Sequence, residues 1–110
     1  MSRRVLVTGS SGFLGAWIVR DLIGRQVPFV MFDRDPDLRR LDNLLPERPG
    51  DLQVVSGDIA DLGALRRTIG EHGVTAIIHL AGLQIPACKA DPLAGAGVNV
   101  LGTLAVFEAA

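Results

Sequence analysis

The chain of 110 residues lacks tyrosine altogether and has one tryptophan, one cysteine and one lysine, Lys89. Without tyrosine, a phenol cannot serve as an acid or base anywhere in the chain. The single Cys88 excludes an intramolecular disulfide and a metal site built from several cysteines, and it suits a reducing cytoplasm. A formal net charge of -1 removes the electrostatic case for nucleic acid or an anionic membrane as a partner.

Long apolar runs, internal repeats and low-complexity tracts are also missing, so we expect no stretch that could span a bilayer. A length of 110 residues with 48% apolar side chains fits one globular domain with a modest core. The basic pair Arg3-Arg4 is followed by an apolar run that breaks at Gly9, which argues against a signal peptide. The sequence therefore predicts a cytoplasmic protein.

The most informative stretch is residues 5–15, VLVTGSSGFLG. An apolar run ends in a turn of small residues, and a helical pattern follows directly, as in the first half of a dinucleotide-binding βαβ unit. Gly9 can take a backbone angle closed to other residues, Gly12 lets a pyrophosphate approach the main chain, and Gly15 lets the helix lie close. The free N–H groups of that helix then face an anion. The alternative is an ordinary tight turn.

Four apolar runs are predicted to be strands, namely residues 3–8, 28–33, 52–56 and 75–80. Helices are predicted at residues 12–24 and 38–44, from an N-cap at Asp61 to about residue 70, and from Asp91 to the last residue. The segment with Pro86 and Cys88 is predicted to be a loop. The apolar positions of the first helix are Phe13, Leu14, Trp17, Ile18, Leu22 and Ile23. Those of the last helix are Val98, Leu101, Leu104 and Val106 or Phe107.

Strands that alternate with helices predict an α/β fold, a doubly wound parallel sheet of Rossmann type with strand order 3-2-1-4. The unit would end after the fourth strand and its following helix, so residues 1–110 form an incomplete nucleotide-binding domain. The crevice between strands one and four places residues 9–15 opposite Ala81-Gly82. The apolar fourth strand becomes an exposed edge, which predicts self-association.

Carboxylates stand where two of these strands end. Asp33 can accept both hydroxyls of an adenosine ribose, or it is a solvated loop acid. Its charge favours NAD over NADP, although the neighbouring Arg34 could hold a 2′-phosphate. Asp58 can accept from an adenine amino group while Ile59 packs on the ring, or it caps the next helix.

Three further side chains have less specific interpretations. His79 lies in an apolar strand and is interpreted as a hydrogen-bonded core histidine rather than a catalyst. Asn99 lies among apolar residues of the last helix, either bonded to backbone or placed at the crevice. Cys88 has no basic partner near it in the sequence and is interpreted as inert.

Four motifs occur in the order found in the extended short-chain dehydrogenase/reductase family. They are Thr8-Gly9-x-x-Gly12-Phe13-Leu14-Gly15, Asp58-Ile59, His79-Leu80-Ala81-Gly82 and Asn99-Val100-x-Gly102-Thr103. Nearly the whole chain resembles the N-terminal, cofactor-binding part of that family's epimerases and dehydratases. The cofactor-binding residues are then Gly9, Ser11, Gly12, Phe13, Leu14, Gly15, Asp33, Arg34, Asp58, Ile59, Leu80, Ala81, Gly82 and Asn99. In this resemblance residues 9–15 hold the pyrophosphate, and residues 80–82 line the nicotinamide side.

The chain departs from this family at two points. Sugar epimerases of the family often have a lysine where this chain has Gln84, which argues against UDP-galactose epimerisation. The family's Tyr-x-x-x-Lys is not among these residues, so we assign no catalytic residue and no metal ligand. The resemblance implies NAD, rather than NADP, in an oxidoreductase or epimerase that moves hydride on a sugar or other hydroxylated substrate. Substrate binding and dimer formation would belong to the full-length parent. The alternative is a non-catalytic dinucleotide-sensing regulator.

Overall fold

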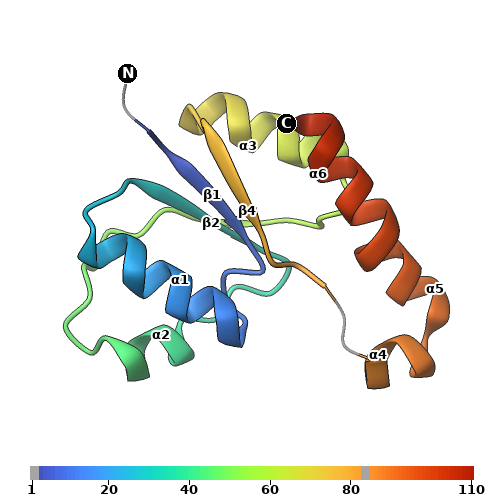
Figure 1. Ribbon diagram of the computed structural model, residues 1–110, viewed down its shortest axis with the longest axis horizontal. Coiled ribbons are helices and arrows are strands. Elements are labelled where there is room, and N and C mark those ends of the chain that lie inside the picture. Colours follow the sequence, from blue (N-terminus) through green and yellow to red (C-terminus); the bar gives the residue numbers. More distant parts are fainter. Residues whose placement is uncertain (1–2, 83–84) are drawn as a thin grey trace.

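The computed structural model describes residues 3–82 and 85–110, so the prediction about Gln84 falls outside the described residues (Figure 1). Its centre is a parallel sheet with strand order β3-β2-β1-β4, which confirms the predicted order. The strands are β1 (Val5–Thr8), β2 (Phe29–Asp33), β3 (Val54–Ser56) and β4 (Ala76–His79). In the register of the sheet, Leu6 of β1 lies opposite Val30 on one side and Ile77 on the other.

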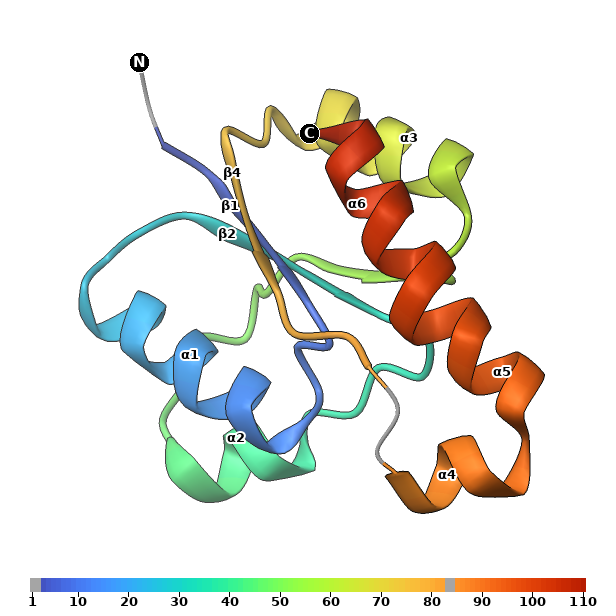
Figure 2. The ribbon, with the colours of Figure 1, turned by 45° about the vertical axis from the view of Figure 1, so that its right-hand side comes forward.

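Helices cover both faces of the sheet, as a parallel sheet requires. On one face lie α1 (Phe13–Gly24) and α2 (Arg39–Leu44), and on the other lie α3 (Leu62–His72) and α6 (Thr103–Ala109), as Figures 1 and 2 show. Between β4 and α6 the chain forms α4 (Ile85–Ala90), α5 (Pro92–Ala96) and a π-helical segment, η1 (Gly97–Gly102). The helix from α5 to α6 is continuous in direction (Figure 2).

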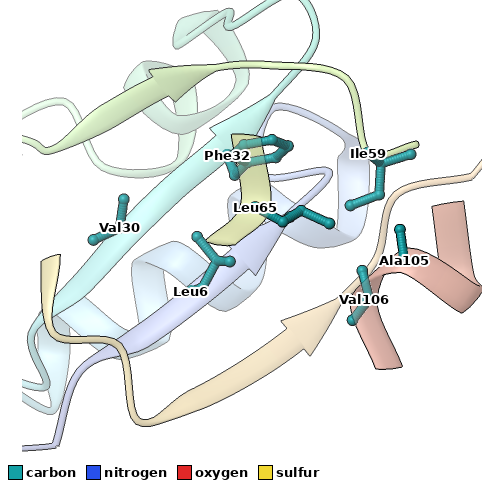
Figure 3. Packing of buried hydrophobic residues seen from close by; sticks show 7 residues of the cluster. All are labelled: Leu6, Val30, Phe32, Ile59, Leu65, Ala105 and Val106. Atoms are coloured by element: carbon teal, nitrogen blue, oxygen red, sulfur yellow. The ribbon is translucent and has the colours of Figure 1, made fainter. Parts of the chain in front are cut away.

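Strand residues alternate between two cores. Leu6, Val30 and Phe32 face α3 and α6, where they pack with Leu65 and Val106 (Figure 3). The opposite face carries Val5, Val7 and Met31, which pack with residues of α1 and α2. All of β1 is buried because it is covered on both faces and paired on both edges.

The predicted apolar face of α1 is partly wrong. The helix buries Gly15, Ala16, Val19 and Leu22, whereas Phe13, Leu14 and Trp17 are exposed. The glycine brings the helix so close to the preceding turn that small side chains form the contact, and the large ones at the first turn face outwards. Trp17 instead packs under the guanidinium of Arg20, which lies 5.3 Å from its ring centroid.

The segment predicted to be a loop forms α4. Pro86 is the second residue of this helix, where a missing N–H breaks no helical hydrogen bond. The next helix starts as predicted. The carboxylate of Asp91 accepts a hydrogen bond from the N–H of Ala94 at 3.1 Å, and Pro92 occupies the first turn.

The last helix leaves most of its predicted apolar stripe exposed. Ala105 and Val106 pack against the sheet and α3, whereas Leu104 and Phe107 are 60% and 77% exposed. By length and composition, the run Pro92–Ala109, with 18 residues and mean hydropathy 1.3, could cross a membrane. This corrects the expectation that no segment is long enough. A single run of this kind is weak evidence for a membrane span, and 22% of this one is buried within the protein.

Candidate functional site

A cleft of about 320 Å³ opens where the parallel strands end. Most of the predicted site residues line it, namely Gly9, Gly12, Asp33, Arg34, Asp58, Ile59, Leu80, Ala81 and Gly82. Phe32, Asp35, Gly57 and Val98 complete its wall. The cleft lies where the strand order changes direction, between β1 and β4, which is the place where open α/β sheets bind ligands.

The three glycines in and after the turn between β1 and α1 differ in why the structure has glycine there. Gly9 has φ +66°, and a Cβ there would lie 2.7 Å from the backbone nitrogen of Ala81. A Cβ on Gly15 would lie 2.3 Å from the carbonyl oxygen of Gly9. Gly12 has an ordinary φ of -74°, and its Cβ would meet only that same oxygen, at 3.3 Å. The protein itself thus needs Gly9 and Gly15, while the missing side chain of Gly12 leaves space beside the cleft.

The amino end of α1 is free to hold an anion. Gly12 is its N-cap, no side chain caps the helix, and the first turn contains no acid. The N–H groups that begin a helix have no partner within it, and their positive end attracts negative charge. Because Phe13 and Leu14 turn their side chains to solvent, their contribution here is the main-chain N–H. The buried Ser10 Oγ beside this turn has no hydrogen-bond partner among the residues described.

Asp33 is held rigidly at the end of β2. Its Oδ2 accepts a hydrogen bond from the N–H of Ser11 at 3.0 Å, and its Oδ1 accepts one from the N–H of Asp35 at 3.2 Å. Each carboxylate oxygen can accept a further bond. Ser11 Oγ accepts from the N–H of Asp37 at 2.7 Å, which ties the loop after β2 to the glycine turn. The pair of bonds at Asp33 therefore fixes a negative charge beside the positive helix end.

The residues after β3 form the adjacent wall. Asp58 is exposed, and its Oδ1 accepts from the N–H of Ala60 at 2.9 Å. It therefore stabilises the turn before α3, whereas the predicted alternative, a cap on that helix, is wrong because Asp61 is the N-cap. Ile59 is only 5% exposed and belongs mainly to the core. It packs so tightly against the last helix that a Cβ on Gly102 would lie 2.6 Å from its Cγ2.

The opposite wall follows β4. Thr8 Oγ1 accepts hydrogen bonds from the N–H groups of Leu80 at 3.0 Å and Ala81 at 3.3 Å, and so holds this strand end against β1. Asn99 does not line the cleft, but its Oδ1 lies 3.2 Å from the position of a Cβ on Gly82. The structure thus places Asn99 directly behind the strand end that forms the wall.

His79 links this wall to the last helix. Its Nδ1 lies 2.7 Å from Thr8 Oγ1, and its Nε2 lies 3.1 Å from Thr103 Oγ1. Thr103 Oγ1 donates its own hydrogen to the carbonyl of Asn99 at 2.9 Å, so it accepts from Nε2–H, and Nδ1 accepts from Thr8. This arrangement requires a neutral imidazole, and burial lowers the pKa of His79 accordingly. The hydrogen bonds expected of His79 are confirmed, whereas its side chain is only partly buried and lies outside the buried core.

The lowered pKa predicts a stability change in acid. Because the unfolded chain binds a proton at His79 more readily than the folded one, the stability is fully present above the ordinary pKa of 6.5. This stabilisation declines as the pH falls from 6.5 through the lower pKa that His79 has in the folded protein. Thermal unfolding between pH 7.5 and 5 should show a falling midpoint, and His79→Gln should flatten the curve. His72→Gln, which changes the only other histidine, should keep the slope; a slope unaffected by His79→Gln would contradict this origin.

Several residues that shape the site were not predicted as site residues, namely Thr8, Ser10, Phe32, Asp35, Gly57 and Val98. Thr8 and Ser10 flank Gly9, so small polar residues beside a turn glycine were an available signal. Val98 reaches the cleft only because the last helix packs back across the sheet.

Residues 6–110 match the family model described as GDP-mannose 4,6 dehydratase. A UDP-glucose 4-epimerase of Pongo abelii is 33% identical over an alignment 117 residues long, which covers 98% of this chain and 34% of that protein. The structure of the Thermus thermophilus UDP-glucose 4-epimerase in complex with NAD superposes with a TM-score of 0.81 at 31% identity, over 96% of this chain and 33% of that one. The Bordetella bronchiseptica enzyme WbmG in complex with NAD and UDP gives 0.80 at 27% identity, over 99% and 34%.

The chain therefore spans about a third of the length of these relatives. The family match covers residues 6–110, and the structural match covers 96% of the chain. This chain belongs to the extended short-chain dehydrogenase/reductase family, in its epimerase and dehydratase branch, and corresponds to the N-terminal part of those proteins.

Proposed function

We propose that this chain is the NAD-binding unit of an oxidoreductase or epimerase that acts on a sugar nucleotide by hydride transfer. The observation that carries the proposal is the cleft, which joins the uncapped end of α1, the fixed carboxylate of Asp33 and the strand end at Leu80–Gly82. Two structural relatives are complexes with NAD, and the named relatives are sugar-nucleotide enzymes, which supports the cofactor and the substrate class.

The residues present fit a dinucleotide. The N–H groups at the start of α1 would hold the pyrophosphate, and the space left by Gly12 would admit it. Asp33 would accept the ribose hydroxyls, since its oxygens keep acceptor capacity after binding two N–H groups. Asp58 and Ile59 would border the adenine. When bound, the nicotinamide supplies the hydride acceptor.

The wall at residues 80–82 would orient the nicotinamide side of the cofactor. Thr8 fixes Leu80 and Ala81, and His79 in turn orients Thr8. These residues position the wall and move no proton in our proposal. The 110 residues contain no tyrosine, so we assign them cofactor binding and leave proton transfer to residues outside this sequence.

Two further assignments belong to the whole protein. We propose homodimer formation through the exposed apolar face of the last helix, where Leu101, Leu104 and Phe107 face solvent. The absence of tyrosine also keeps a second candidate function, a dinucleotide-sensing regulator without catalysis. A Tyr-x-x-x-Lys pair encoded after Ala110 would favour the enzyme, and a complete gene without one would favour the regulator.

Replacing Asp33 with alanine is expected to weaken NAD binding by about 10- to 100-fold. Hydrogen bonds to a charged group contribute roughly 1.5–3 kcal/mol, and this carboxylate would accept those of the ribose. Isothermal titration calorimetry with NAD measures the change. Asp42→Ala removes an exposed carboxylate on α2 and serves as the matched control. An unchanged dissociation constant in Asp33→Ala would remove this residue from the site.

A further inference from the structure

The loop after β2 contains a second charged arrangement beside Asp33. A shallow hollow next to the cleft is lined by Ser11, Asp33, Asp37, Arg39 and Arg40. The N–H of Asp37 donates to Ser11 Oγ at 2.7 Å, which fixes its main chain against the glycine turn. Its side chain is therefore held over the same hollow that borders the carboxylate of Asp33.

The carboxylate of Asp37 binds one edge of the Arg39 guanidinium, through Nε and Nη2. Arg39 Nη2 lies 2.6 Å from Asp37 Oδ2, and Arg39 Nε lies 3.0 and 3.1 Å from its two carboxylate oxygens. The main-chain N–H of Arg39 also donates to Asp37 Oδ1 at 2.9 Å. The paired guanidinium lowers the pKa of Asp37 to about 2, so both partners stay charged throughout the neutral range. Asp37 therefore occupies the Nε–Nη2 edge of Arg39, and its negative charge reduces the attraction of this guanidinium for another anion.

A guanidinium such as that of Arg39, which is paired with Asp37, is also the group that recognises a 2′-phosphate on the adenosine ribose. Arginine binds phosphate through two parallel N–H bonds, the geometry that the Asp37 carboxylate already uses. Arg34 and Arg39 both lie near Asp33, so the sequence alone would have allowed a phosphate site here. Asp37 disfavours phosphate binding in this hollow in two ways. Its carboxylate adds negative charge there, and it pairs with Arg39.

We propose that Asp37 is a second determinant of coenzyme choice, which excludes a 2′-phosphorylated dinucleotide by holding Arg39 in an internal ion pair. The inference rests on the proposed NAD-binding function and adds to it a specificity residue outside the strand-end carboxylate. Asp37 acts through Arg39 and not by contact with NAD. When only the charge of Asp37 is removed, the carboxylate of Asp33 still repels the 2′-phosphate. The gain in NADPH affinity is therefore expected only when Asp33 is also replaced by a neutral residue.

The test compares NADH and NADPH binding in Asp33→Ser and in Asp33→Ser/Asp37→Asn. Asparagine keeps the main-chain bond to Ser11 and can still accept from the N–H of Arg39, so the loop is retained. The chain has a single tryptophan, Trp17 on α1, whose emission overlaps the absorption of a reduced nicotinamide. Quenching of this emission therefore reports both ligands in the same chain, and circular dichroism checks that each variant is folded.

The double variant is expected to bind NADPH about tenfold more tightly than Asp33→Ser, with little change for NADH. Adding Arg39→Gln should remove that gain, and raising the salt concentration should reduce it, since the Arg39 side chain is exposed and salt screens exposed charges. Asp33→Ser/Asp42→Asn, which breaks the pair between Asp42 of α2 and Arg48, should behave like Asp33→Ser.

Equal NADPH affinity in Asp33→Ser and the double variant would overturn the proposal. So would a gain that survives Arg39→Gln, because the released guanidinium would then have no part in it. If the unsubstituted chain binds NADH but Asp33→Ser and the double variant have the same NADPH affinity, only the proposed role of Asp37 is wrong. If the folded, unsubstituted chain binds neither ligand, the proposed function itself fails and this inference fails with it.

Discussion

Replacing Gly12 with valine is expected to abolish NAD binding while leaving the fold intact. The backbone at Gly12 has φ -74°, which any residue adopts. Beyond its chain neighbours, an added Cβ would contact the carbonyl oxygen of Gly9 at 3.3 Å, a tight contact that requires a shift of a few tenths of an ångström. The added methyl groups would instead occupy space between the amino end of α1 and the cleft. Losing two hydrogen bonds from helix N–H groups to a charged pyrophosphate weakens binding by about 100-fold or more.

Calorimetry with NAD tests whether Gly12→Val has lost binding, and a thermal unfolding curve of the same preparation tests whether the fold is intact. Gly24→Val is the control, since it places the same side chain at the other end of α1, where a Cβ meets nothing within 4 Å. Normal NAD binding by Gly12→Val would mean that this glycine does not border the pyrophosphate. Unfolding of the variant would show that its role lies in the backbone.

Replacing Gly15 with alanine should have the opposite signature and destabilise the fold itself. The new Cβ would lie 2.3 Å from the carbonyl oxygen of Gly9 and 2.7 Å from two backbone atoms of Ser10, so neither neighbour can yield by rotating a side chain. The start of α1 must then move away from the turn. Overpacking of this kind costs about 1–3 kcal/mol, which lowers the unfolding midpoint of a chain this size by roughly 5–15 °C.

The matched control is Gly24→Ala, the same substitution in the same helix at an open position. Alanine favours helix over glycine by up to about 1 kcal/mol, so this variant should unfold at an unchanged or slightly higher temperature. Differential scanning calorimetry of both variants measures the contrast. Equal midpoints for Gly15→Ala and Gly24→Ala would show that α1 can leave the turn at little cost, and would contradict the close contact.

The predictions that succeeded rest on local patterns. A strand buried on both faces must be apolar at every position, so residues 3–8 and 28–33 identified β1 and β2 directly. Asp61 caps α3 as expected, because a short carboxylate before a helix satisfies its first N–H groups locally. The strand-end carboxylate Asp33 followed from the fixed length of a βαβ unit.

The predictions that failed depended on what each helix packs against. Phe13 and Trp17 have helical apolar spacing but face solvent, since Gly15 sets which side of α1 approaches the turn. In the last helix, Val106 is buried and Phe107 exposed. Periodicity identifies an apolar stripe but does not say which of two adjacent stripes the neighbouring element covers.

The sequence by itself determined the βαβ order, the glycine turn and the strand-end positions of Asp33 and Asp58, because each is set by neighbours within a few residues. Only the tertiary structure decided the pairings between distant segments. The Thr8–His79–Thr103 chain of hydrogen bonds joins residues 71 and 24 positions apart, and the Asp33–Ser11 bond spans 22. Such contacts form because the parallel sheet brings its strand ends to one edge, where side chains far apart in sequence meet and complete one another's hydrogen bonds.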